Sequence, residues 1–92
     1  MTLDEFDAAL AALGWKVADF CRMTGLHRNT PSRWRTEGVE IPAWVPQHLG
    51  LLLDVKRLHA VAQVPTTDKA AGWLAQDLQR LHAAYLEPPT HD

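Results

Sequence analysis

Cysteine is nearly absent from this sequence: Cys21 stands alone, so no disulfide can form within the chain. A lone thiol suits a reducing compartment. The first residues, MTLDE, also lack the basic region and the apolar run of a secretory signal peptide. No apolar stretch approaches the roughly 20 residues that a helix needs to cross a bilayer. We therefore expect a soluble cytoplasmic protein that does not bind membranes.

The sequence also has little that would support catalysis or bind a metal. No acid, base and nucleophile stand at a spacing that catalytic arrangements use. His48, His59 and His82 are scattered, with no cysteine or carboxylate at ligand spacing. Cys21 is interpreted as a packing residue. We expect no enzyme activity, no cofactor, no metal and no small-molecule ligand.

What the chain does contain is enough apolar material for one small folded domain. Its 92 residues are 47% hydrophobic and include four tryptophans, which excludes general disorder. The net charge of −2 is unevenly spread. Residues 1–14 carry three acidic side chains and no basic one, whereas residues 15–38 carry five basic side chains against two acidic ones. Such a local positive charge matters more to a nucleic-acid partner than the total charge does.

The apolar residues repeat with helical spacing and do not alternate as a half-buried strand requires. This pattern predicts an all-α protein, a compact bundle of about five helices at residues 3–13, 16–23, 28–36, 42–62 and 69–86. Pro31 and Pro46 are alternative starts for the third and fourth helices, because proline is tolerated in a first turn. We expect three parts: a first unit at 1–64, a C-terminal helix at 65–87 that follows a break at Val64-Pro65, and a frayed tail at 88–92.

Short motifs predict where these helices begin and end. Thr2 and Glu5 have the spacing of a capping box, and Gly14 is a plausible stop for the first helix. Gly25 can adopt the positive φ of a tight turn. Residues 66–68, Thr-Thr-Asp, are expected to cap the last helix.

One apolar stripe on the last predicted helix has coiled-coil-like spacing. It consists of Leu74, Leu78, Leu81 and Tyr85. Such a stripe either packs into the core of its own chain or forms the seam of a homodimer, and both interpretations stay open here. The second interpretation makes these four residues the candidate dimer interface.

The segment 17–34, VADFCRMTGLHRNTPSRW, has the spacing of two short helices joined by a tight turn. Cys21 is small, as the close approach of two helices requires, and Gly25 follows four residues later. Three apolar residues would form the rest of the motif core: Phe20, Leu26 and Trp34. This pattern resembles the helix-turn-helix of the lambda-repressor-like and Cro-like (XRE-type) DNA-binding family. The resemblance covers roughly residues 3–60, and its specific part lies within 17–38.

The resemblance implies that the second helix of the motif, the recognition helix, lies in the major groove of double-stranded DNA. Its outward residues would then contact base edges: His27, Arg28, Asn29, Ser32 and Arg33. Neighbouring residues are placed for phosphates, which fix the register without reading sequence: Lys16, Thr30, Arg35 and Thr36. Arginine can bind guanine, and asparagine adenine, through two hydrogen bonds each.

Pro31 departs from the family pattern, which usually has a branched aliphatic residue at this position. The recognition helix then begins at Asn29 or Thr30, with either as its cap, or it begins at Arg28 and is distorted. The base contacts of Ser32 and Arg33 depend less on this choice than those of the residues before them.

Two functional hypotheses follow. The first is a sequence-specific DNA-binding transcriptional regulator, a homodimeric autorepressor of phage or bacterial type. It would read an inverted repeat with two recognition helices about 34 Å apart. The second is a helix-turn-helix protein-interaction module, an antitoxin or phage adaptor, that does not read DNA. The positive segment favours the first, whereas the near-neutral total charge and Pro31 favour the second.

Overall fold

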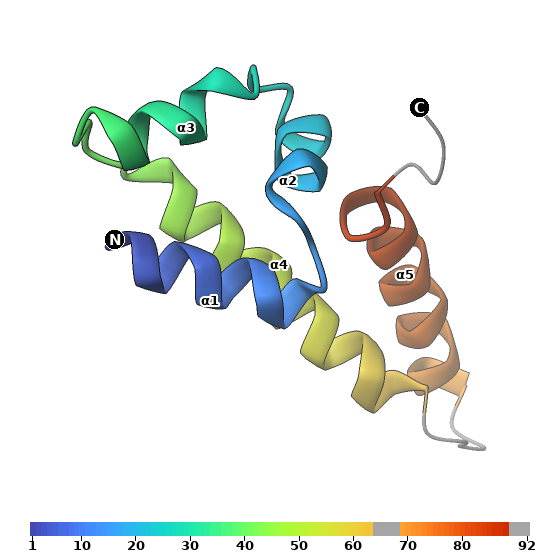
Figure 1. Cartoon of the computed structure of the whole chain (residues 1–92). Coiled ribbons are helices and arrows are strands. Elements are labelled where there is room, and N and C mark those ends of the chain that lie inside the picture. The colour runs from blue at the N-terminus through green and yellow to red at the C-terminus, as the bar shows by residue number, and fades with distance from the viewer. Residues whose placement is uncertain (64–68, 89–92) are drawn as a thin grey trace.

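The computed structural model describes residues 1–63 and 69–88 of the chain. Its regular structure is helical (Figure 1): α1 (Leu3–Leu13), α2 (Val17–Thr24), α3 (Asn29–Thr36), α4 (Trp44–Ala62) and α5 (Lys69–Tyr85). These residues include no strand, so the prediction of an all-α fold of about five helices is confirmed. The expected break at Val64-Pro65, the cap at 66–68 and positions 89–92 of the expected tail lie outside the described residues.

Helix α1 begins and ends where the local chemistry predicts. The Thr2 hydroxyl accepts the Glu5 N–H at 3.1 Å, and the Glu5 carboxylate accepts the Thr2 N–H at 2.9 Å, which completes the capping box. Gly14 ends the helix with a φ of 74°, and its N–H donates to the Ala11 carbonyl at 3.0 Å. The helix is therefore fixed at both ends.

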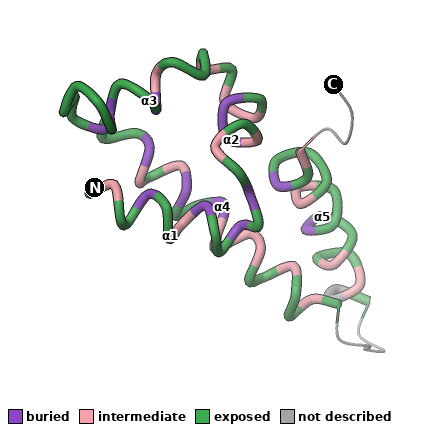
Figure 2. Tube along the Cα trace, in the orientation of Figure 1, coloured by how far each residue is buried: buried purple, intermediate pink, exposed green. Residues whose placement is uncertain are grey.

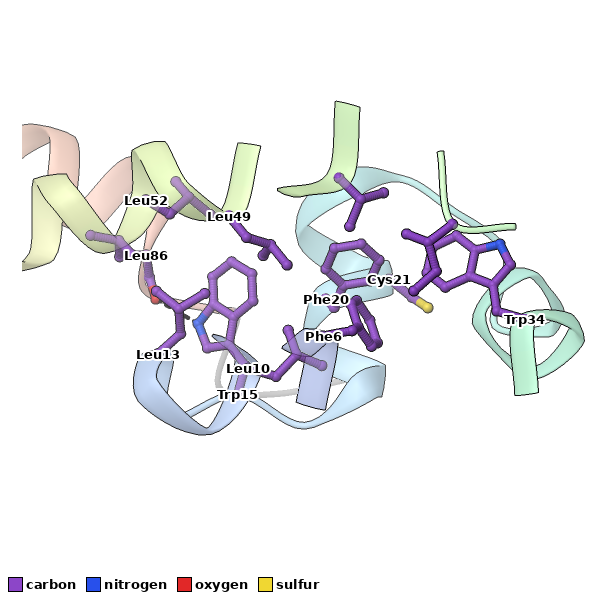
Figure 3. Close-up of a cluster of buried hydrophobic side chains, with 12 residues drawn as sticks. Phe6, Leu10, Leu13, Trp15, Phe20, Cys21, Trp34, Leu49, Leu52 and Leu86 are labelled. Atoms are coloured by element: carbon purple, nitrogen blue, oxygen red, sulfur yellow. Dashed lines mark hydrogen bonds between the residues drawn. The ribbon is translucent and has the colours of Figure 1, made fainter. Parts of the chain in front are cut away.

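Three aromatic rings join α1, α2 and α3 (Figure 3). The ring of Phe6 in α1 is edge-on to Phe20 of α2, at a centroid distance of 5.1 Å, and to Trp34 of α3, at 5.4 Å. Edge-to-face pairs of this kind are favourable beyond the area that they bury. Since Trp34 and Pro31 are the buried residues of α3, this cluster is what fastens α3 to the rest of the fold.

Helix α4 runs beside α1 and extends well beyond it (Figure 1). Its buried residues, Val45, Leu49 and Leu52, stand three and four positions apart and therefore form one face. Lys56 on α4 donates to the Ala12 carbonyl at 2.5 Å. This lysine satisfies one of the carbonyls that the end of α1 leaves without an intrahelical partner.

Helix α5 returns antiparallel along the C-terminal half of α4 (Figure 1). Trp15, between α1 and α2, donates its indole N–H to the Leu86 carbonyl at 2.9 Å (Figure 3). Leu86 is buried and belongs to the same core cluster as the residues of α1, α2 and α4. The C-terminal helix therefore packs on the unit formed by the first four helices.

The predicted stripe on α5 divides between the interior and the surface, and Figure 2 shows most of α5 exposed. Leu78 is buried and Leu81 half-buried, whereas Leu74 and Tyr85 are more than half exposed. Leu78 packs within its own chain and is not available to a second copy. Of the candidate dimer interface, Leu74 and Tyr85 are the most accessible residues.

Candidate nucleic-acid interface

A four-residue connection, from Gly25 to Arg28, joins α2 to α3. Gly25 has a φ of 76°, and its N–H donates to the Cys21 carbonyl at 2.9 Å. A residue with a Cβ is strained at such a φ, so glycine lets α2 end and the chain turn at once. Leu26 follows and packs against the core. The remaining residues of the predicted motif core are all buried: Phe20, Cys21 and Trp34.

Pro31 is the third residue of α3 and lies in its first turn. The first four N–H groups of a helix have no intrahelical acceptor, so proline removes no helical hydrogen bond there. Its ring is fully buried. The helix begins at Asn29, one of the predicted starts, but the predicted cap at Asn29 or Thr30 is wrong. The residue before the helix is Arg28, and the His27 ring accepts the Asn29 N–H at 3.1 Å.

The residues predicted to contact bases lie together at the start of α3, and all are exposed: His27, Arg28, Asn29, Ser32 and Arg33. Asn29, Ser32 and Arg33 are spaced three and four residues apart, so they share one face of the helix. Pro31 and Trp34 are buried on the other side. Helix α3 therefore presents a polar face to solvent while its apolar face is anchored in the core.

The two arginines of this face differ in what they contact. Arg33 Nε donates to a Glu37 carboxylate oxygen at 2.9 Å, and both side chains are mostly exposed. An exposed ion pair contributes about 0.2–1 kcal/mol, so a nucleic acid can replace Glu37 at small cost. The Arg28 side chain has no ion-pair partner among residues 1–63 and 69–88. Arg28 is thus the more accessible cation.

The residues predicted to contact phosphates are less uniformly available. Asp7 of α1 binds Arg35 through both carboxylate oxygens, with 3.2 Å between Nη1 and Oδ2. The Thr36 hydroxyl donates to the Ser32 carbonyl at 3.0 Å. Arg35 therefore connects α3 to α1 in this structure. Of the other two residues, Lys16 is exposed and Thr30 is half-buried.

Carboxylates of the same chain neutralise part of this surface. Asp19 accepts an Arg22 guanidinium N–H at 2.5 Å and the Lys16 backbone N–H at 2.8 Å. Three of the five basic residues in 15–38 are thereby paired: Arg22, Arg33 and Arg35. Arg22 lies three residues from Asp19, and Arg33 lies four residues from Glu37. Such spacings on a helix predict ion pairs. Local spacing does not indicate which acid Arg35 binds, because Asp7 lies 28 residues away in the sequence.

Acid is expected to weaken these contacts. The Arg35 guanidinium lowers the pKa of Asp7 below its ordinary value of 3.8, and the Lys16 N–H, followed by Arg22, does the same for Asp19. A carboxyl whose pKa is lowered by folding stabilises the fold above its unfolded pKa, and this contribution is lost as the pH falls through the folded pKa. We expect the contribution of Asp7 and Asp19 to the free energy of unfolding to be intact above about pH 5 and to decrease below about pH 4, as measured by urea denaturation of the wild type against variants of these residues.

Asp7→Asn isolates the contribution of the ion pair to Arg35. Because the pair is exposed, the variant should be about 0.2–1 kcal/mol less stable than the wild type at neutral pH. The difference should vanish once Asp7 of the wild type is protonated. Glu40→Gln removes an exposed carboxylate from the loop before α4 and is the matched control. If Asp7→Asn is as stable as Glu40→Gln at neutral pH, the pair does not stabilise the fold.

The described part of the chain contains neither a membrane-spanning helix nor a cluster of metal-ligating side chains. None of its helices combines the length and the apolar character that crossing a bilayer requires. Its histidines, cysteine and carboxylates nowhere gather in threes as a metal site needs. Comparison with protein-family models, with curated proteins and with solved structures finds no match.

Proposed function

We propose that this protein is a sequence-specific, double-stranded DNA-binding transcriptional regulator in which α3 enters the major groove. The observation that carries the proposal is the exposed polar face of α3, anchored from behind by Trp34 in the aromatic cluster. A helix with its side chains is about 10–12 Å across, which matches a major groove about 12 Å wide. Arg28, Asn29 and Arg33 supply the donors that read guanine and adenine edges.

Two features support the interpretation of α2 and α3 as a helix-turn-helix. The connection between them is short and turns at Gly25 with a positive φ. Both helices contribute a ring to one cluster, Phe20 and Trp34, which keeps their relative orientation fixed. In such a motif the first helix crosses the DNA backbone, so the exposed Lys16 at the start of α2 is suited to a phosphate.

The regulator is proposed to act as a homodimer. One α3 offers few base-reading side chains, and each bidentate pair with a base discriminates by about 1–3 kcal/mol. A second copy doubles these contacts and places a second α3 one helical turn away, about 34 Å along the duplex. A chain of this kind would act in the cytoplasm as an autorepressor that responds to its own concentration.

Selection from a pool of random duplexes, followed by footprinting, tests the proposal. We expect an inverted repeat whose half-sites are centred about 10–10.5 base pairs apart, and an affinity that decreases steeply with salt. An asymmetric single site would contradict the homodimer and leave DNA binding standing. No enrichment, together with no salt-dependent binding to random duplex, would contradict DNA binding itself.

A second candidate function is a protein-interaction module, such as an antitoxin or a phage adaptor, that has this fold and does not read DNA. The observation that favours it is the pairing of Arg22, Arg33 and Arg35 with carboxylates of the same chain. These pairs reduce the local positive charge that attracts a polyanion. The same selection distinguishes the two functions, because an interaction module enriches no duplex.

A further inference from the structure

A ten-residue pattern occurs twice in the two C-terminal helices. Residues 51–60 read LLLDVKRLHA and residues 74–83 read LAQDLQRLHA, with six of ten positions identical. The shared pattern is L-x-x-D-x-x-R-L-H-A. One copy lies within α4 and the other within α5, and these two helices pack against each other. We call the two copies the paired segments.

The structure relates the paired segments by a local twofold axis. The two helices are antiparallel (Figure 1), and His59 stacks on its equivalent, His82, with ring centroids 4.2 Å apart. Equivalent residues of two antiparallel helices meet only where a local twofold axis passes between them. Each segment also has the same internal ion pair, at 3.1 Å in α4 and 3.5 Å in α5: Asp54 with Arg57, and Asp77 with Arg80.

This symmetry brings equivalent leucines to one side of the helix pair. Leu51 and Leu58, seven residues apart on α4, are 61% and 50% exposed. Leu74, the equivalent of Leu51, is 57% exposed. Leu81, the equivalent of Leu58, lines a groove of about 390 Å³ between the helices together with Leu51 and Tyr85. These four leucines define what we call the α4–α5 face.

Exposed apolar side chains are concentrated in this part of the molecule. Nine large ones are exposed among the residues that the structure describes, and six of them belong to α5 or to α4 beyond Gly50. The six are Leu51, Leu58, Val61, Trp73, Leu74 and Tyr85. A surface of this kind on a small chain marks an interaction site.

We infer that the α4–α5 face is where a second copy of this chain docks, with its own α4–α5 face, across a twofold axis. The inference deepens the proposed function, since it rests on the homodimer proposed there. It makes the interface a surface of both helices, with Leu51 and Leu58 of α4 as important as Leu74 and Leu81. Leu78, although part of the sequence stripe, is buried and contributes only to the packing within each copy.

Charge favours a second copy over other occupants. The residues that line the groove include no aspartate, glutamate, lysine or arginine. In each paired segment the aspartate and the arginine three residues apart form an ion pair, and the additional Lys56 of the first segment donates to the Ala12 carbonyl of α1. The groove itself offers a charged peptide or an anionic bilayer no charge to bind.

A twofold-related copy is, in contrast, complementary. Each copy presents the same exposed leucines and the same uncharged groove. Across a twofold axis, the apolar face of one copy therefore meets an identical apolar face of the other. Self-complementarity of this kind is what a symmetric dimer interface requires.

Sedimentation equilibrium on the full chain tests the inference. We expect the 10.3 kDa monomer to reach twice that mass as its concentration rises from the micromolar toward the millimolar range. Leu51→Glu/Leu74→Glu places carboxylates at two equivalent positions of the face and should weaken the dimer roughly a hundredfold or more. The milder Leu51→Ala/Leu74→Ala should weaken it roughly tenfold. Val39→Glu, at an exposed apolar residue of the loop before α4, is the matched control and should leave the dimer intact.

Charge variants test the same interface independently. Asp54→Arg/Asp77→Arg leaves only positive charge beside the face, so the two copies repel each other and the dimer should weaken. Adding Arg57→Asp and Arg80→Asp returns one aspartate and one arginine to each pair of positions and should restore the dimer. Circular dichroism checks that each variant is folded, which we expect because all the substituted side chains are exposed or half-buried.

The outcomes separate this inference from the proposed function. A wild-type chain that stays monomeric at every concentration would overturn the inference, as would a dimer that Leu51→Glu/Leu74→Glu leaves unchanged. Binding to a duplex with a single half-site is measured in parallel. A chain that dimerises through this face and ignores DNA contradicts DNA binding and leaves the inference standing. A monomer that binds the half-site contradicts the inference and the proposed homodimer, and it leaves DNA binding standing.

Discussion

Trp34→Ala is expected to destabilise the protein by about 3–5 kcal/mol, the usual loss when a large buried aromatic side chain is truncated. Trp34 is edge-on to Phe6 at 5.4 Å and lies 6.3 Å from Phe20, so its removal takes the largest ring from a cluster of three and leaves a cavity beside the other two. A domain of this size has a free energy of unfolding of about 5–15 kcal/mol. The variant should therefore be partly unfolded at 37 °C, and urea denaturation followed by circular dichroism will measure the loss.

Trp73→Ala is the matched control, because Trp73 is 69% exposed on α5. At a concentration where the chain is monomeric, this change should alter the free energy of unfolding by no more than about 0.5 kcal/mol. If Trp34→Ala costs no more than Trp73→Ala, the aromatic cluster is not what anchors α3. The proposed recognition surface would then lack its rigid support.

Much of the fold could be predicted from the sequence because its helix ends are encoded locally. Thr2, Glu5 and Gly14 define α1 through contacts within a few residues, and the structure confirms them. Gly25 takes the positive φ predicted for the turn. The hydrogen bond from Trp15 to the Leu86 carbonyl spans 71 residues, and no local pattern indicates such a contact. The docking of α5 could therefore not be predicted in the same way.

The candidate site was predictable in its positions and not in its contacts. Spacing alone placed the polar residues of α3 on an exposed face. It did not reveal that the His27 ring accepts the Asn29 N–H, because a histidine side chain reaches two residues ahead only in a particular turn geometry. The pair between Asp7 and Arg35 depends on how α1 and α3 are arranged in space.

The paired segments are a different case, because the signal is in the sequence itself. Aligning residues 51–60 with residues 74–83 reveals six identities. A search for a single helical stripe overlooks them, since it treats each helix separately. Their meaning still requires the structure. Only the antiparallel packing, with His59 against His82, turns a repeated pattern into a symmetric surface.

Arg28→Ala/Arg33→Ala should reduce affinity for the selected duplex by about a hundredfold or more, while affinity for random duplex should fall much less. Each arginine that binds a guanine through two hydrogen bonds discriminates by about 1–3 kcal/mol, and a homodimer loses the contact at both half-sites. Lys16→Ala, in contrast, should weaken binding to all sequences about equally and reduce the salt dependence, as the loss of a phosphate contact does. Fluorescence anisotropy at two salt concentrations measures both effects.

Glu37→Gln makes the test sharper, because it removes the carboxylate that binds Arg33 without touching the arginine. If Arg33 leaves Glu37 to reach a base, the variant should bind the selected duplex more tightly than the wild type does. The gain should disappear when Arg33→Ala is added.

Lys69→Ala, at the start of α5, changes the net charge far along the chain from α3 and is the control for a purely electrostatic effect. Equal responses to Arg28→Ala/Arg33→Ala and Lys69→Ala would mean that α3 does not read DNA. Its polar face would then be a solvated surface, and the interaction module would be the better proposal.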